Sequence, residues 1–134
     1  MKVQELMKTK IASVDADRSV YDAVEKMVDR RIRSLLVRFP GKDLNHGIIT
    51  ARDIVFKVLA KGLNPRDIKV SEIASKPVVC FDKNADITEA AALMEKKKIA
   101  RVFVCEGEKI IGVISLIDIM VGALIMRARG NHVS

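Results

Sequence analysis

Residues 47–54 read Gly-Ile-Ile-Thr-Ala-Arg-Asp-Ile, and residues 112–119 read Gly-Val-Ile-Ser-Leu-Ile-Asp-Ile. Both stretches run from a glycine through two β-branched apolar residues to a hydroxyl residue, with Asp three positions further on. The apolar run predicts a short strand, and the stretch behind it predicts a helix. The hydroxyl residue would cap that helix, and Asp would lie in its first turn. Each stretch therefore predicts a strand-to-helix corner that carries a hydroxyl, a carboxylate and free backbone N–H groups.

The duplication extends over most of the chain. Residues 3–6 match residues 70–73 at an offset of 67 (70 − 3), and similar pairs follow at the same offset. Towards residue 47 the offset falls to 65 (112 − 47). The two-residue change lies in residues 39–43, where Pro and Gly predict a turn. An insertion confined to a turn is typical of two diverged copies of one structural unit.

The same order of elements is predicted in both copies. Strands are expected at residues 11–14, 34–38 and 44–49, and again at 78–81, 101–105 and 109–114. A helix capped by Ser19 or Asp86 separates the first two strands of each copy. The helix behind each corner should run to about Ala60 and to about Arg129. Val20, Ala23, Met27 and Val28 form the apolar face of the first helix, and this spacing is typical of core.

These patterns predict an α/β (α+β) fold of two tandem β-α-β-β-α repeats. The first repeat covers residues 1–62, a linker covers 63–69, the second repeat covers 70–126, and a flexible tail covers 127–134. A unit of about 60 residues buries little apolar surface by itself. We therefore expect the two repeats to pack together with pseudo-twofold symmetry.

Composition narrows the class of protein. The chain has 134 residues, of which 49% are hydrophobic and 31% charged, so it can bury a core. Its net charge of +7 favours anionic partners, which could be nucleotides, nucleic acid or an acidic protein. Residues 110–126 are almost wholly apolar, but Asp118 and a glycine corner favour a strand and a buried helix over a membrane span.

The N-terminus, the two cysteines and the two histidines bear on cellular location and on catalysis. The N-terminus has no apolar stretch typical of a secretion signal, and Cys80 and Cys105 lie in apolar runs that favour buried, reduced thiols. A cytoplasmic protein follows from these two interpretations. His46 and His132 are isolated, and we expect both to be solvated. Because the sequence has no phosphate-binding loop, nucleophile elbow or metal-spaced His/Cys set, we predict neither an enzyme nor a catalytic cofactor.

Tandem β-α-β-β-α units that end in Gly-h-h-Thr/Ser-x-x-Asp, where h is apolar, resemble a pair of CBS domains, also called a Bateman module. The resemblance runs from Val3 to about Leu124 and includes both copies of the motif. It implies a regulatory module that binds adenosine-containing ligands such as AMP, ADP, ATP, S-adenosylmethionine or a dinucleotide. It also implies that the motif Asp accepts hydrogen bonds from ribose hydroxyls, and that the motif hydroxyl contacts phosphate.

The resemblance places two quasi-equivalent ligand sites between the repeats. The first would use Val113, Ser115, Asp118 and Arg101, facing Met7, Ala12, Ile32 and Arg33. The second would use Ile48, Thr50 and Asp53, facing Ala74, Val79 and Ile99, with Arg52 as its nearest cation. The phosphate positions of the second site are the uncharged Ser34 and Ala100. Because charge-assisted contacts are the stronger ones, we expect the Asp118 site to bind a phosphorylated ligand more tightly than the Asp53 site.

Other interpretations remain open. Thr50 and Ser115 could be plain helix caps, and Asp53 and Asp118 plain first-turn carboxylates. Basic clusters at residues 30–31 and 96–98 could complement helix dipoles or bind a nucleic-acid backbone. A scaffold for protein interactions that binds no ligand is a further alternative.

Regulation requires an output beyond the ligand site. The family resemblance implies a homodimer of CBS pairs, and an effector protein that the sequence does not identify. The helices behind the two corners carry more apolar side chains than one small core needs, and we expect these side chains to form the dimer interface. They are Val55, Phe56, Val58, Leu59, Ile119, Met120, Ala123 and Leu124.

Overall fold

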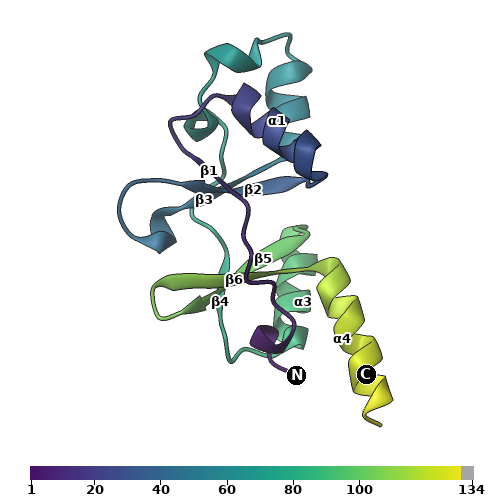
Figure 1. The fold of residues 1–134 in the computed structure, drawn as a ribbon. Coiled ribbons are helices and arrows are strands. Elements are labelled where there is room, and N and C mark those ends of the chain that lie inside the picture. Colours follow the sequence, from purple (N-terminus) through teal and green to yellow (C-terminus); the bar gives the residue numbers. More distant parts are fainter. Residues whose placement is uncertain (131–134) are drawn as a thin grey trace. The chain divides into compact units, whose positions relative to one another are not determined.

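The computed structural model describes residues 1–130 as two compact units (Figure 1). The first-repeat unit, Ile11–Val78, contains β1 (Ser13–Asp15), α1 (Val20–Arg30), β2 (Ser34–Arg38) and β3 (Gly47–Thr50). Its last helix begins as α2 (Ala51–Ile54) and continues as the π-helical segment η3 (Val55–Leu59). Short 3₁₀ turns lie at η2 (Asp43–Asn45), η4 (Pro65–Asp67) and η5 (Val70–Glu72). The sheet order is β1-β2-β3, with β1 parallel and β3 antiparallel to β2.

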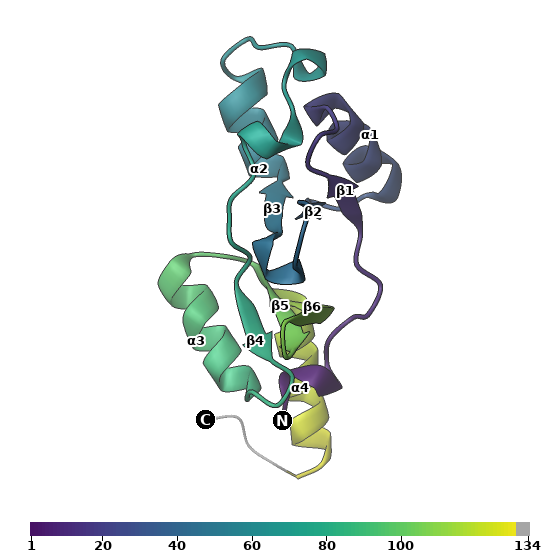
Figure 2. The same cartoon turned by 90° about the vertical axis from the view of Figure 1, so that its left-hand side faces the viewer.

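The second-repeat unit comprises Met1–Lys10 and the chain from Val79 onward. It contains the 3₁₀ turn η1 (Val3–Glu5), β4 (Cys80–Asp82), α3 (Ile87–Lys97), β5 (Arg101–Glu106), β6 (Lys109–Ser115) and α4 (Leu116–Ala128). The sheet order is β4-β5-β6, with the same pattern of parallel and antiparallel pairs. Helices α3 and α4 contact each other and the sheet of this unit (Figure 2). The predicted β-α-β-β-α order is thus present twice.

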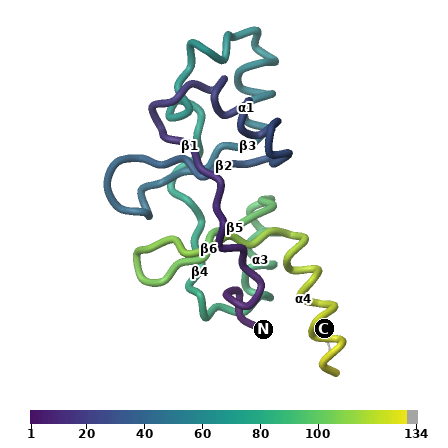
Figure 3. The backbone as a smooth tube through the Cα atoms, viewed as in Figure 1, coloured from purple at the N-terminus to yellow at the C-terminus, as the bar shows by residue number. Residues whose placement is uncertain are grey.

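The compact units differ from the sequence repeats because each repeat gives its leading segment to the other unit. Val3 is fully buried in the core of the second-repeat unit, and its amide donates to Ala85 O at 2.8 Å. Its counterpart Val70 is fully buried in the first-repeat unit, where its amide donates to Arg18 O at 2.8 Å. Figure 3 follows the N-terminal segment past β6. The first ten residues are therefore structural parts of the unit that holds Asp118.

Close packing secures the leading segment at two glycines. A Cβ atom at Gly112 would lie 2.5 Å from Sδ of Met7, and one at Gly122 would lie 2.5 Å from Cδ1 of Leu6. Real Cβ contacts are longer than this, so a side chain at either glycine would force the Met7 or Leu6 side chain to shift. Glycine at these positions lets residues 6 and 7 approach β6 and α4.

Some details of the predicted elements are wrong. The first strand of each repeat begins two residues later than predicted, at Ser13 and at Cys80. The third strand begins at Gly47 and not at Leu44, because Asp43–Asn45 form the 3₁₀ turn η2 and Leu44 is partly exposed. Val28 is 69% exposed and does not join the core face of α1. Val24 packs against that core instead.

His46 is buried, which corrects the prediction of a solvated side chain. Its exposed fraction is 4%, and its Nδ1 accepts a hydrogen bond from the Phe39 amide at 3.0 Å. Burial lowers the pKa of His46 below its ordinary value, and the Asp43 carboxylate acts in the opposite direction. The imidazole therefore closes the β2–β3 connection as a neutral acceptor. His132 lies outside the described residues.

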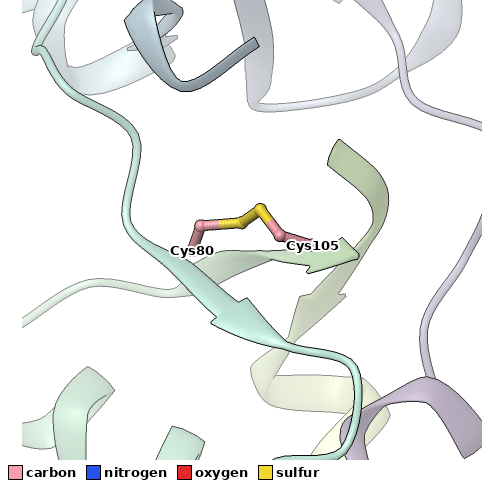
Figure 4. The surroundings of a disulfide bond; sticks show 2 residues. All are labelled: Cys80 and Cys105. Carbon is pink, nitrogen blue, oxygen red and sulfur yellow. A yellow bond between two sulfur atoms is a disulfide. The ribbon is translucent and has the colours of Figure 1, made fainter. Parts of the chain in front are cut away.

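A disulfide joins Cys80 on β4 to Cys105 on β5 (Figure 4), so the prediction of reduced thiols is wrong. The two Cα atoms are 6.0 Å apart, which is an ordinary separation for a disulfide. Parallel pairing of β4 with β5 places Cys80 opposite Phe103 and Cys105 opposite Asp82, so the two cysteines lie on neighbouring strands two positions out of register. The apolar context was insufficient to predict this, because buried thiols and buried disulfides occur in similar sequence. The cytoplasmic location stays a prediction.

Candidate functional site

The Ser115–Asp118 corner lies where β6 meets α4. Asp118 Oδ2 accepts the Ser115 amide at 2.8 Å and the Ser115 hydroxyl at 2.9 Å, while Ser115 Oγ accepts the Asp118 amide at 3.4 Å. This reciprocal arrangement is a capping box. Asp118 is only 5% exposed. The corner thus combines a helix cap with a nearly buried carboxylate, at the start of a helix of 13 residues.

The Thr50–Asp53 corner repeats the same bonds. Asp53 Oδ2 accepts the Thr50 amide at 3.0 Å and the Thr50 hydroxyl at 2.9 Å, and the Asp53 amide donates to Thr50 Oγ1 at 3.1 Å. Here the α-helical part, α2, has only four residues before the π-helical segment begins. The capping role anticipated for both hydroxyl residues is confirmed, and in both corners it occupies Oδ2 of the Asp.

The second carboxylate oxygen faces a lysine in both corners, and neither lysine was predicted from the sequence. Asp118 Oδ1 lies 3.3 Å from Nζ of Lys8, and Asp53 Oδ1 lies 3.2 Å from Nζ of Lys57. Lys57 could have been found, since Asp and Lys four residues apart on a helix commonly pair. Lys8 could not, because only the docking of the N-terminal segment brings it to Asp118.

Strand pairing places a cation next to one motif hydroxyl and not the other. Arg101 is the cross-strand partner of Ser115 in the β5–β6 ladder, and Ser34 is the partner of Thr50 in the β2–β3 ladder. Directly opposed residues of an antiparallel pair have their side chains on the same face. The predicted difference in charge between the corners therefore holds at this position.

The other predicted residues of the Asp118 site divide between the units. Val113 and Met7 share the second-repeat unit with Asp118, and both backbone polar groups of Val113 bond to Lys8 at 2.9 Å. The Val113 amide is therefore already paired, and its carbonyl already accepts one hydrogen bond. Ala12, Ile32 and Arg33 belong to the first-repeat unit, so their part in the Asp118 site stays a prediction.

The predicted Asp53 site divides in the same way. Ile48 and Ala74 share the first-repeat unit with Asp53, and Ile48 exchanges backbone hydrogen bonds with Ser75 at 2.9 Å. Val79 and Ile99 belong to the second-repeat unit, and their part stays a prediction.

Of the two cations near this corner, Lys57 and not Arg52 pairs with Asp53. The Arg52 guanidinium lies 5.0 Å from the centre of the exposed Phe56 ring, whereas Lys57 pairs with the carboxylate. A contact between Arg52 and a ligand phosphate stays a prediction.

Sequence comparison decides the family. The sequence profile of the CBS domain matches residues 3–60 and residues 70–123. The chain belongs to the CBS-domain family. The two matched segments are the two repeats, and CBS pairs are in general regulatory or sensor modules.

Relatives of this CBS pair include an uncharacterised protein of Methanopyrus kandleri, 31% identical over 121 residues. The match covers 90% of this chain and 61% of that relative, so the chain spans less than two thirds of its length. A CBS-domain protein from Burkholderia ambifaria has a similar solved structure, with a TM-score of 0.85 and 27% identity over 93% of this chain and 95% of that one. A hexameric CBS-CP12 protein from cyanobacteria has a TM-score of 0.82 and 27% identity, covering 100% of this chain and 86% of its own.

Apolar side chains are exposed on the corner helices of this CBS pair. Most of the predicted dimer residues are exposed, but Val58 is fully buried in the core and is no part of such a surface. On α4 the exposed apolar side chains are Leu116, Ile117, Met120, Val121 and Leu124, which we call the α4 apolar face. Among residues 1–130, no helix is long and apolar enough to cross a membrane.

The basic clusters lie at the ends of two helices. Arg30 is in the last turn of α1, and Lys96 and Lys97 are in the last turn of α3. Arg31 and Lys98 follow them as C-caps in the left-handed region, with φ of 54° and 55°. Cations at these places complement the helix dipoles, as the simpler interpretation requires.

Proposed function

We propose that this CBS pair is a regulatory module that binds an adenosine-containing ligand, of the AMP, ADP or ATP kind, at the Ser115–Asp118 corner. The observation that carries the proposal is the nearly buried Asp118 carboxylate. One of its oxygens caps α4, and the other faces the ammonium group of the long, exposed Lys8 side chain. A carboxylate accepts hydrogen bonds and donates none, so two adjacent ribose hydroxyls are suitable partners for it.

The surroundings of this corner suit a phosphate. The N-terminus of α4 carries a partial positive charge, and Arg101 is the cross-strand partner of Ser115. The Thr50 corner has Ser34 in the equivalent place and only four α-helical residues behind it. We therefore propose that the Asp118 site is the tighter of the two for a phosphorylated ligand.

The test is calorimetric titration of the full chain with AMP, ADP, ATP, S-adenosylmethionine and NAD. Asp118→Asn keeps an oxygen that can accept the Ser115 amide, but it replaces the other carboxylate oxygen with a donor group. Asp53→Asn is the matched variant. We expect Asp118→Asn to abolish tight binding and Asp53→Asn to leave it. Loss of binding only in Asp53→Asn would reverse the order of the sites.

The same ligands can be screened by thermal unfolding. A ligand at 100 times its dissociation constant should raise the free energy of unfolding by about 2.7 kcal/mol. If no ligand changes the melting temperature, the result would favour the alternative in which the chain is a scaffold for protein interactions and binds no ligand. Retention of the chain by an oligonucleotide, weakening steeply with salt, would favour nucleic-acid binding through the basic clusters.

We also propose that the output is carried by self-association and by an effector protein. The α4 apolar face supports this, because contiguous exposed apolar side chains are typical of interaction sites. The hexameric cyanobacterial relative supports it as well. Sedimentation of the full chain should give a dimer or larger species, and Met120→Glu should shift it towards the monomer. A monomer in the unmodified protein at micromolar concentration would contradict the proposal.

A further inference from the structure

The two ion pairs on the motif aspartates arise in different ways. At the repeat offset of 67, the counterpart of Lys8 is Ser75, and at the offset of 65, the counterpart of Lys57 is Gly122. Neither lysine therefore has a charged equivalent in the other copy. Duplication of the corner accounts for the two aspartates, but it does not account for an ammonium group on Oδ1 of each one.

Lys8 is anchored at its backbone, while its side chain is largely exposed to solvent. Its amide donates to Val113 O, and its carbonyl accepts from the Val113 amide, both at 2.9 Å, so its Cα is fixed at the edge of β6. Its side chain is 69% exposed, whereas that of Asp118 is 7% exposed. The ammonium group thus covers the carboxylate from the solvent side and can leave it without moving the backbone.

Lys57 differs because its ammonium group has two acceptors. Its ammonium group contacts Asp53 Oδ1 at 3.2 Å and the Ile73 carbonyl at 3.4 Å. It also lies on the same helical segment as Asp53, four residues along. Lys8 is therefore the lysine better placed to change partner.

We propose that Lys8 makes the Asp118 site selective for phosphorylated over unphosphorylated adenosine ligands, an inference that rests on the function proposed above. A phosphate bound near an ionised Asp is repelled by it, and a nearby ammonium group offsets that repulsion. When ribose hydroxyls take Oδ1 of Asp118, the Lys8 ammonium is released and binds the phosphate as a point charge. Unphosphorylated adenosine displaces the same ion pair through its ribose hydroxyls, but it offers no phosphate to the released ammonium group.

The test compares AMP with adenosine in calorimetric titrations of the full chain. Lys8→Met keeps the length of the side chain and removes its charge, and Lys8→Arg restores a cation. Lys10→Met, at an exposed lysine two residues away, is the matched loss of charge outside the Asp118 ion pair. We expect Lys8→Met to lower the ratio of AMP affinity to adenosine affinity by about 10-fold or more. Lys8→Arg should restore much of the ratio, and Lys10→Met should leave it unchanged.

The outcomes separate this inference from the proposed function. If adenosine binds and Asp118→Asn abolishes it, but Lys8→Met leaves the ratio unchanged, the role of Lys8 is overturned and the ligand site stands. If Lys8→Met weakens the binding of AMP and of adenosine equally, Lys8 is only a structural part of the N-terminal segment. That result also overturns its selective role. If neither compound binds the unmodified chain, the adenosine site and the role of Lys8 both fail.

Discussion

Arg101, the first residue of β5, stands directly opposite Ser115, the last residue of β6. The equivalent pair in the other unit is Ser34 and Thr50, which carries no charge. Two corners with the same capping bonds thus differ in the residue across the strand. This difference gives the Asp118 corner a second cation, across the strand, in addition to Lys8.

Replacement of Arg101 by Met should therefore weaken AMP binding at the Asp118 corner by about 10- to 100-fold, the range for loss of one charge-assisted contact. Adenosine binding should change much less, because the missing contact is to phosphate. Calorimetric titration with both compounds measures this. Ser34→Ala is the matched change at the other corner, and a larger loss of AMP affinity in that variant would contradict the prediction.

The leading segments provide a crossed test of the fold. Val3→Ala should destabilise the second-repeat unit by about 2 kcal/mol, since it removes buried apolar groups and leaves a cavity. Val70→Ala should do the same to the first-repeat unit. Hydrogen exchange should show reduced amide protection in β4–β6 for the first variant and in β1–β3 for the second. Each valine belongs by sequence to the other repeat. If protection fell in the unit of that repeat, the leading segments would not be shared between the units as described.

Reduction of the disulfide should lower the free energy of unfolding. The bond between Cys80 and Cys105 closes a loop with a sequence separation of 25 residues, for which the loss of chain entropy in the unfolded state corresponds to about 3.5 kcal/mol. Urea unfolding with and without a reductant measures the effect. The double variant Cys80→Ser with Cys105→Ser should be as stable as the reduced protein, and the reductant should not change its free energy of unfolding. Equal stability of oxidised and reduced protein would contradict the expected contribution.

Stability should also decrease in mildly acidic solution because of His46. Since burial lowers the pKa of His46 in the folded state, the unfolded chain binds the proton first as the pH falls below about 6.5. Protonation also removes the acceptor for the Phe39 amide. The melting temperature should therefore fall between pH 7.5 and pH 5.5. His46→Gln should show a smaller fall, and an equal fall in both proteins would assign the effect to other groups.

Local sequence patterns were sufficient for much of the fold. The strand at Ser34–Arg38 and the capping hydroxyls at Thr50 and Ser115 lie where the pattern placed them, because strand alternation and capping involve residues a few positions apart. Errors occurred where burial by distant residues decides the outcome. His46 lies in a connection whose sequence predicts a solvated turn, yet it is buried. Val28 lies on a helix face whose spacing predicts core, yet it is exposed.

By itself, the sequence determined the two repeats, the order of their elements and the hydroxyl and carboxylate at each corner. Tertiary structure alone decided which unit holds each leading segment, which ammonium faces each Asp, and that Cys80 meets Cys105. The physical reason is the range of the interactions. Helix caps and strand periodicity act between near neighbours in the chain, whereas Lys8 meets Asp118 only after Val3 is buried in a core built from the far end of the sequence.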